Sequence, residues 1–190
     1  MPLFLASQSP RRRELLTQIG VVFEPLDVAV DETPAADEPA LDYVRRVARE
    51  KAGAGLLQVS AVAGALVLGA DTEVVLDGAV FGKPRDAADA TRMLRLLSGR
   101  RHQVISAVAV VSAGREDEAV AISEVTFAAL DEAAIGAYVE SGEPFGKAGG
   151  YAIQGRGATL VAHLSGSYSG VMGLPLFETA ALLRGFGFAL

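Results

Sequence analysis

The sequence has no cysteine, only two histidines and no long apolar run. The missing cysteines exclude disulfides, thiolate metal sites and cysteine nucleophiles. No apolar run approaches the ~20 residues that a membrane-spanning helix needs. The chain reaches Arg11 after only ten residues, too few for the charged, apolar and cleavage regions of a signal peptide. We therefore expect a cytoplasmic protein with no membrane partner.

Several common functional motifs are also absent. There is no Gly-x-x-x-x-Gly-Lys-[Ser/Thr] loop, no Gly-x-Gly-x-x-Gly between a strand and a helix, and no Gly-x-Ser-x-Gly elbow. His102 and His163 lie far apart, and neither has a metal-ligand spacing. The net charge of −6 and the scarce aromatic residues argue against nucleic-acid binding, which needs a basic face. Arginines, lysines and carboxylates remain, which favours metal-assisted phosphate chemistry over acyl transfer.

Lysine is rare, because the 17 basic residues comprise fourteen arginines and only three lysines, Lys51, Lys83 and Lys147. In a chain that otherwise uses arginine, a lysine indicates a place where a compact ammonium is needed and a planar guanidinium does not serve. Lys51 follows Val44 at i+7 spacing on the apolar face of a helix predicted over 39–57. Such a lysine either extends past the core edge or lines a cleft.

The stretch 66–84 is the most informative part of the chain. An apolar strand is predicted to end at Asp71 and Thr72, and Asp77-Gly78 then predicts a two-residue hairpin turn. The returning strand ends at Lys83, which brings an ammonium back towards Asp71. An acid, a hydroxyl and a lysine suit a metal-bound phosphate ester. A turn aspartate with a solvated lysine is the alternative.

A second candidate anion site lies near the start of the chain. A strand over 3–6 leads to Ser9 as the predicted N-cap and Pro10 as the first residue of a helix that ends near Gly20. Arginines at 11–13 oppose the helix dipole, whereas an anion is stabilised at a helix start. A phosphate bound between them would explain this conflict. A solvated basic face is the alternative.

Alternating strands and helices predict an α/β fold in which residues 1–190 form one domain. A strand over 21–30 leads to Asp31 and Glu32, an adjacent pair of acids that either binds a metal or borders a hydrated loop. The other predicted elements are helices that begin at Asp86, Asp131 and Pro175, strands over 103–112, 119–129 and 159–164, and a glycine-serine loop over 165–173.

Residues 141–158 are rich in glycine, which marks backbone that turns tightly or approaches a ligand closely. Lys147 and Gln154 are the polar side chains that we single out here. Because an amide both donates and accepts hydrogen bonds, Gln154 suits the imide edge of a uracil or thymine ring. A surface loop is the alternative.

The sequence contains, in this order, the blocks Ser7-Gln8-Ser9-Pro10-Arg11-Arg12, Gly69-Ala70-Asp71-Thr72, Gly82-Lys83-Pro84, Ser141-Gly-Glu-Pro with Lys147-Ala-Gly-Gly-Tyr-Ala-Ile-Gln-Gly, and Gly166-Ser-Tyr with Gly173-Leu-Pro-Leu. These blocks resemble the Maf family of nucleotide pyrophosphatases over nearly the whole chain. The resemblance implies an elongated α/β fold, with a mixed sheet, flanking helices and a deep cleft between two lobes. It also implies hydrolysis of nucleoside triphosphates to the monophosphate and pyrophosphate with a divalent metal cation, Mg²⁺ or Mn²⁺.

The block around Gln154 resembles the branch of the family that acts on dTTP and UTP rather than the branch that prefers methylated GTP. One departure is Gly146, where that branch often carries an acid. The resemblance also implies roles for single residues. Asp71 matches the proposed general base, and Arg11, Thr72 and Gln154 match positions associated with substrate selection. The polar lining of the cleft is matched by Ser7, Arg12, Glu32, Lys51 and Lys83.

Our hypothesis is that a water oriented by Asp71 attacks the α-phosphorus of dTTP or UTP, while Lys51 and Lys83 offset the charge that develops. Glu32 and Asp71 are the expected metal ligands. The alternative function is a nucleotide-binding regulator of cell division without turnover, a role also attached to the family. The expected partner is a nucleoside triphosphate and not a nucleic acid, and a homodimer is compatible with this interpretation.

Overall fold

A long mixed sheet forms the centre of the computed structural model, which describes residues 1–190. Its seven strands have the order β2-β1-β3-β5-β6-β7, and β4 pairs with β3 outside this path. β1 is parallel to β2 and β3, and the other pairs are antiparallel. The strands are β1 Leu3–Ala6, β2 Glu24–Leu26, β3 Leu66–Leu76, β4 Ala79–Phe81, β5 Arg101–Ser112, β6 Arg115–Phe127 and β7 Val161–Ser165.

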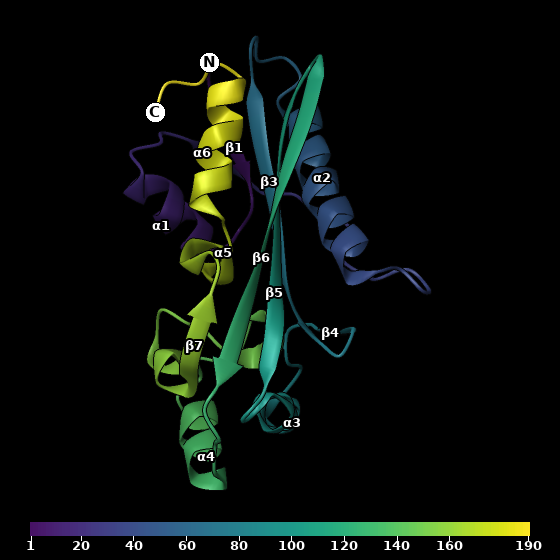
Figure 1. Cartoon of the computed structure of the whole chain (residues 1–190). Coiled ribbons are helices and arrows are strands. Elements are labelled where there is room, and N and C mark those ends of the chain that lie inside the picture. Colours follow the sequence, from purple (N-terminus) through teal and green to yellow (C-terminus); the bar gives the residue numbers. More distant parts are fainter.

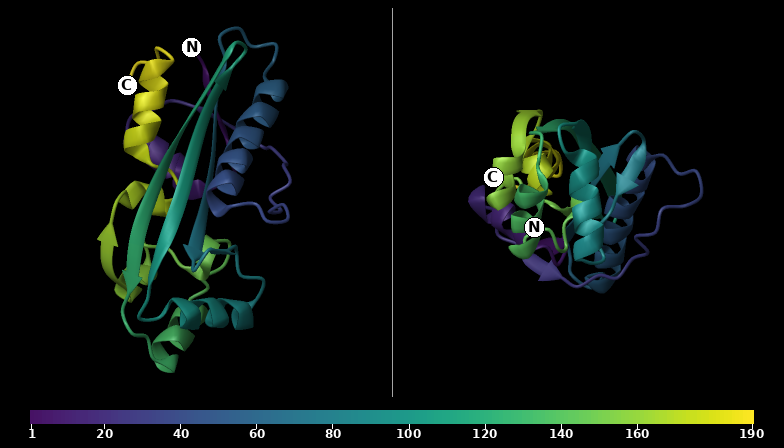
Figure 2. Two further views of the ribbon diagram at one scale, coloured as in Figure 1. Left: turned by 45° about the vertical axis from the view of Figure 1, so that its right-hand side comes forward. Right: turned by 90° about the horizontal axis from the view of Figure 1, so that it is seen from below.

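The helices cover both faces of an elongated molecule (Figure 1). α2 lies on one face of the sheet in the upper half, α1 and α6 lie on the other face, and α3 and α4 lie at the lower end (Figures 1 and 2). The expected elongated α/β fold with a mixed sheet and flanking helices is confirmed. The α-helices are α1 Pro10–Gln18, α2 Ala40–Gln58, α3 Ala87–Leu97, α4 Glu132–Glu140, α5 Tyr168–Met172 and α6 Leu176–Gly185, and the 3₁₀ helices are η1 Ala148–Gly150 and η2 Arg156–Leu160.

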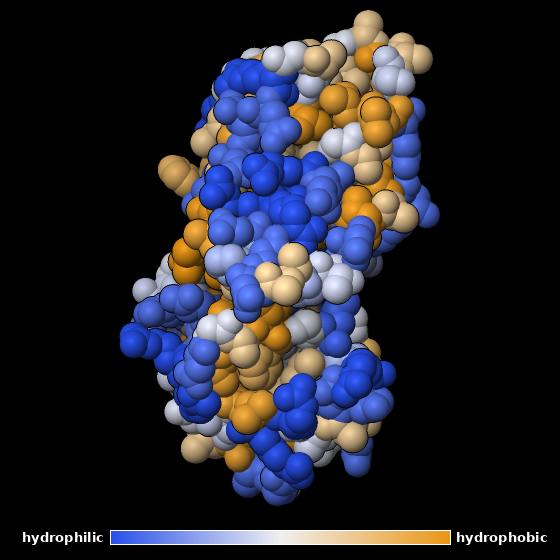
Figure 3. Space-filling model, turned by 90° about the vertical axis from the view of Figure 1, so that its right-hand side faces the viewer, coloured by the Kyte–Doolittle hydropathy of each residue, from blue (hydrophilic) through white to orange (hydrophobic).

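The α2 side of the molecule is mainly hydrophilic, and its apolar surface is broken into separate areas (Figure 3). α2 buries one apolar face against the sheet and leaves charged residues such as Arg49 and Glu50 exposed. None of the helices has the combination of length and hydropathy that a membrane crossing requires.

Alternation along β3 decides which side chains face α2. Leu66 and Leu68 belong to the apolar cluster under α1 and α6, whereas Val67 belongs to the cluster under α2. Because successive strand residues point to opposite faces, Asp71 lies on the α2 face and Thr72 on the opposite face. A third apolar cluster packs α3 and α4 against the lower ends of β3 and β5.

One edge of β3 is interrupted between residues 70 and 73. β1 pairs with β3 only as far as Gly69, and β4 begins its pairing at Val74. β5 occupies the other edge continuously over 67–75. The segment 70–73 therefore has no neighbouring strand on one side, which leaves room for a cavity where side chains from both faces of β3 meet.

The predicted strand ends need correction. β3 does not end at Asp71 and Thr72 but continues to Leu76, because β5 pairs with it beyond those residues. The strand predicted over 21–30 is reduced to Glu24–Leu26, since only these three residues pair with β1.

Two local predictions near helix starts also need correction. The segment predicted as a loop over 165–173 contains α5, whose N-cap Ser167 accepts a hydrogen bond from Gly170 N. Ser9 occupies the N-cap position of α1, but its side chain makes no capping hydrogen bond. Instead, Ser7 Oγ accepts a hydrogen bond from Ser9 N at 3.2 Å and shapes this turn.

Candidate active site

A cavity of about 370 Å³ opens beside the interrupted edge of β3. Its walls come from the turn before α1, from α2, from β3, from the segment after β4, from the glycine-rich segment and from the end of α5. Ligand sites typically have volumes of about 300–1,000 Å³. The nine side chains to which the resemblance assigns roles all line this cavity, namely Ser7, Arg11, Arg12, Glu32, Lys51, Asp71, Thr72, Lys83 and Gln154. Lys147 lines it too, whereas Asp31, the predicted partner of Glu32 in an acid pair, does not.

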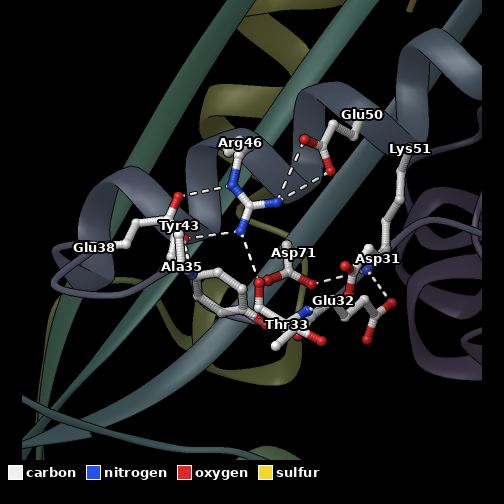
Figure 4. Close-up of polar contacts among 10 residues, drawn as sticks. All are labelled: Asp31, Glu32, Thr33, Ala35, Glu38, Tyr43, Arg46, Glu50, Lys51 and Asp71. Atoms are coloured by element: carbon white, nitrogen blue, oxygen red, sulfur yellow. Dashed lines mark hydrogen bonds and ion pairs between the residues drawn. The ribbon is translucent and has the colours of Figure 1, made fainter.

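Lys51 is the centre of a charged cluster in this cavity. Its Nζ lies 2.9 Å from Asp71 Oδ1 and 2.7 Å from Glu32 Oε1 (Figure 4). The lysine on α2 reaches β3 because Gly69 lets helix and strand approach closely, and a Cβ there would stand 2.3 Å from Ala48 O. Lys51 is buried and lines the cleft, which decides between the two placements that the sequence left open.

Lys83 joins the cluster through Glu32 rather than through Asp71. Its Nζ lies 3.2 Å from Glu32 Oε2, so lysines hold both oxygens of Glu32. Burial opposes the ionisation of Glu32, but the two ammonium groups outweigh burial and lower its pKa to about 2. The hairpin therefore brings Lys83 to the cavity, as predicted, but its ion pair is with a different carboxylate.

Contacts with α2 fix the loop that carries Glu32. Tyr43 donates its hydroxyl hydrogen to Glu32 O at 2.8 Å, and Arg46 donates to Thr33 O at 3.1 Å. Arg46 also donates to both carboxylate oxygens of Glu38, at 2.7 and 2.8 Å (Figure 4). These contacts place the Glu32 carboxylate next to the lysine of α2.

The start of α1 forms another wall of the cavity. Arg12 donates from Nε to Gly173 O at 2.8 Å and from Nη1 to Ser7 Oγ at 3.2 Å. Arg11 donates from Nε to Met172 O at 3.3 Å. Burial lowers the pKa of Arg12 below its ordinary value, although a guanidinium keeps its charge near neutrality. The remaining guanidinium N–H groups and the first backbone N–H groups of α1 are suited to an anion.

Thr72 reaches the cavity from the other face of β3. Its Oγ1 lies 2.7 Å from Ser106 Oγ on the neighbouring strand. Asp71 and Thr72 both line the cavity because the edge of β3 is open at this point, so a single strand contributes from both faces.

The cavity is basic although the chain is acidic. Five basic and three acidic side chains line it, whereas the whole chain has a net charge of −6. Burial, followed by the charge of Arg11, lowers the pKa of Lys147, one of the five. The site is therefore electrostatically suited to a polyanion.

A family model described as "Maf-like protein" matches residues 2–186 of this chain. The chain belongs to the Maf family. A dTTP/UTP pyrophosphatase from Xanthomonas euvesicatoria pv. vesicatoria is 59% identical over 187 residues, which cover 97% of this chain and 98% of the relative. A dTTP/UTP pyrophosphatase from Xanthomonas oryzae pv. oryzae is 58% identical with the same coverage. A nucleoside triphosphate pyrophosphatase from Xylella fastidiosa is 56% identical over 185 residues, again covering 97% and 98%.

In this Maf chain, Glu143 organises the glycine-rich segment. Its carboxylate accepts hydrogen bonds from Arg156 N at 2.8 Å, from Gly157 N at 2.9 Å and from the Tyr138 hydroxyl at 2.8 Å. The segment folds back over this carboxylate and places Gln154 at the cavity, with Gln154 Oε1 buried and without a partner. No role was predicted for Glu143 from the sequence, where it appears only within one of the family-like blocks. The sequence signal for this role is an acid placed just before a glycine-rich segment, whose backbone N–H groups need hydrogen-bond acceptors.

Gly146, the one departure from the Maf branch pattern, has a backbone reason to be glycine. Its φ of 72° lies in the left-handed region, which costs glycine little. It lines the cavity beside Lys147, so the loop approaches the site with backbone where an acid is often found.

Glu73 is the chief residue of this Maf site that the sequence analysis missed. It lines the cavity and is only 8% exposed, and its Oε2 has no hydrogen-bond partner. Burial, followed by the charge of Asp71, raises the pKa of Glu73 to about 8. The two-residue period of a strand places Glu73 on the same face as Asp71, so the signal appears once β3 is known to continue.

The donor groups partly suit a metal ion. No three His, Cys, Asp or Glu side chains form a cluster that could hold one. Asp71 Oδ2 is nevertheless buried without a partner. Because Mg²⁺ is commonly bound by one or two carboxylates together with phosphate oxygens and waters, these residues fit a cation that binds with a phosphate substrate.

Proposed function

We propose that this Maf chain hydrolyses dTTP and UTP to the nucleoside monophosphate and pyrophosphate. The observation that carries the proposal is that nine side chains from separate segments line one basic cavity. The names of relatives that are 58–59% identical over nearly the whole chain, dTTP/UTP pyrophosphatase, support the same substrates.

The basic side chains would bind the triphosphate. Arg11 and Arg12 reach the cavity from α1, and both are anchored on backbone carbonyls that hold their orientation. Lys51 reaches it from α2 and Lys83 from the segment after β4, and both already form ion pairs with Glu32. Cations that are fixed before the substrate arrives need no reorganisation when charge develops on the phosphoryl oxygens.

Asp71 is the proposed general base. Lys51 holds its Oδ1 at 2.9 Å, while its Oδ2 has no partner and is free to orient a water. As the water oxygen bonds to the α-phosphorus, the bond from that phosphorus to the oxygen of the β-phosphate breaks. Asp71 Oδ2 takes the proton of the water, and pyrophosphate leaves with the bridging oxygen.

Gln154 is the proposed reader of the base. Its Oε1 is buried at the cavity without a partner, so it can accept the N3–H of a thymine or uracil ring. Its amide N–H groups can donate to a ring carbonyl of the same base. A cytosine presents an amino group and an unprotonated N3 at this edge, so it mismatches both contacts while the Gln154 amide keeps the orientation seen here.

We further propose Mg²⁺ or Mn²⁺ as the cofactor. When bound, the cation would offset the negative charge of the phosphate oxygens. Asp71, whose Oδ2 is buried without a partner, would be its first ligand, and Glu32 was predicted as its second. We also keep the cytoplasm as the proposed location, and the homodimer stays a prediction.

The test is release of pyrophosphate and monophosphate from dTTP, UTP, CTP, GTP and methylated GTP, with Mg²⁺ and with Mn²⁺. Asp71→Asn is expected to lower turnover of dTTP and UTP at least about 100-fold. Asp77→Asn, in the exposed turn of the same hairpin, is the matched control and is expected to keep full activity. Normal turnover by Asp71→Asn would remove Asp71 from its role.

The same panel separates the enzyme from the alternative function. A regulator would bind dTTP in the same cavity without metal-dependent turnover. If calorimetry shows that dTTP binds while no substrate of the panel releases pyrophosphate, the regulator is the function and the hydrolase is refuted.

A further inference from the structure

Asp71 and Glu73 present two free carboxylate oxygens to the same cavity. They are 6% and 8% exposed, and Asp71 Oδ2 and Glu73 Oε2 are both buried without a hydrogen-bond partner. Residues two apart on a strand lie about 7 Å apart on one face, so both carboxylates can reach one small ion. Buried polar atoms without partners are rare in folded proteins and need an explanation.

Glu32 offers no such free oxygen. Its Oε1 lies 2.7 Å from Lys51 Nζ, and its Oε2 lies 3.2 Å from Lys83 Nζ. A cation bound to Glu32 would have to displace an ammonium group and would be repelled by the other one. Glu32 is therefore better suited to hold the two lysines in place than to bind a metal.

We propose that Asp71 and Glu73, rather than Asp71 and Glu32, hold the divalent cation. This inference rests on the proposed function, because the remaining coordination positions are left to triphosphate oxygens and waters. The cation supplies the partner that two buried carboxyl oxygens, Asp71 Oδ2 and Glu73 Oε2, lack within the protein. Each carboxylate oxygen has two lone pairs, so Asp71 Oδ2 can face the cation and still orient the water.

The test is Mn²⁺ binding to the full chain, measured from the spin-resonance signal of free Mn²⁺, without nucleotide and with an α,β-methylene analogue of dTTP. Glu73→Gln is expected to weaken Mn²⁺ binding at least tenfold. Glu32→Gln removes a carboxylate from the same cavity and is the matched control, with an expected change of less than threefold. Glu73→Asp keeps the charge but withdraws it by one methylene, and intermediate weakening is expected.

Thermal unfolding without metal checks the fold of each variant. Glu73→Gln is expected to unfold at or above the temperature of the parent protein, because an amide of the same shape that cannot ionise replaces a buried carboxyl group. Equal Mn²⁺ affinity of Glu73→Gln and the parent protein would overturn the inference. Weakening confined to Glu32→Gln, or no Mn²⁺ binding by the parent protein in either condition, would also overturn it.

Failure of the proposed function has a different signature. If the substrate panel shows no pyrophosphate release while Mn²⁺ binding still depends on Glu73, the proposed metal site is supported and the proposed reaction is refuted.

Discussion

The contact between α2 and β3 at Gly69 is expected to control both stability and activity. In a Gly69→Ala variant, the new Cβ would stand 2.3 Å from Ala48 O and 2.6 Å from Ala52 N. Both atoms are backbone of α2, so no side chain can rotate away to make room. An ordinary Cβ contact begins near 3.4 Å, so the helix must retreat by about 1 Å. Lys51 lies in the same turn of α2 and retreats with it.

The size of both effects follows from this displacement. Overpacking a core typically costs about 1–3 kcal/mol, and a backbone obstacle places Gly69→Ala near the upper end, at about 3 kcal/mol. In a domain of this size, that corresponds to a fall in Tm of about 6–12 °C. The Lys51–Asp71 hydrogen bond of 2.9 Å is lengthened by the same movement. We therefore expect kcat/KM for dTTP to fall at least tenfold.

Thermal unfolding and pyrophosphate release, the latter measured well below the lower Tm, check the two effects separately. Gly53→Ala is the matched control, because Gly53 lies in the same helix and nothing stands within 4 Å of a Cβ there. Alanine is favoured over glycine inside a helix by about 0.5–1 kcal/mol, so this variant is expected to gain stability and keep its activity. An unchanged Tm in Gly69→Ala would refute the packing argument. A lowered Tm with full activity would refute the link to Lys51.

Lys83→Arg is expected to lower kcat/KM for dTTP at least tenfold, because a planar fork replaces a point charge beside Glu32; Arg85→Lys, outside the cavity, serves as the control. Arg46→Met is expected to lower kcat several-fold by freeing the loop of Glu32, and Arg49→Met on the same helix is not; equal kcat values would contradict this. Burial lowers the pKa of His102 to about 4. Between pH 6.5 and 4, His102 is therefore protonated in the unfolded chain but not in the folded chain. As the pH falls through this range, about 3 kcal/mol of the stability present above pH 6.5 is lost. His102→Phe is expected to remove this loss in urea unfolding measured at pH 7.5 and 4.5, and parallel losses in both proteins would contradict it.

Local sequence signals predicted many of the elements because their causes are local. Asp86 and Asp131 were predicted to start helices, and each side chain accepts a hydrogen bond from a backbone N–H three residues later. Asp77-Gly78 forms the predicted hairpin turn, with positive φ at both residues. The helical period also placed Lys51 on the buried face of α2. Each of these features is decided within about one or two turns of chain.

The geometry of the site depends on pairing between distant segments and could not be predicted in the same way. Serine commonly caps helices, so Ser9 was predicted as the cap. The turn is instead organised by Ser7, whose hydroxyl oxygen accepts hydrogen bonds from Arg12 and from the backbone N–H of Ser9. Lys83 was expected to approach Asp71, but the loop carrying Glu32 lies between them in the ion-pair network. The position of that loop depends on Arg46 and Tyr43 of α2, which no local pattern connects with it.

Glu73 was missed because the end of β3 was predicted too early in the sequence. The apolar run before Asp71 ends in sequence, so the strand was predicted to end there and the two-residue alternation was not continued. In the structure β3 continues, but the strands along one of its edges do not. β1 pairs with β3 only as far as Gly69, and β4 pairs with it only from Val74 onward. β5 keeps β3 extended across that gap. Asp71, Thr72 and Glu73 fall within this gap, and all three line the cavity that opens beside it.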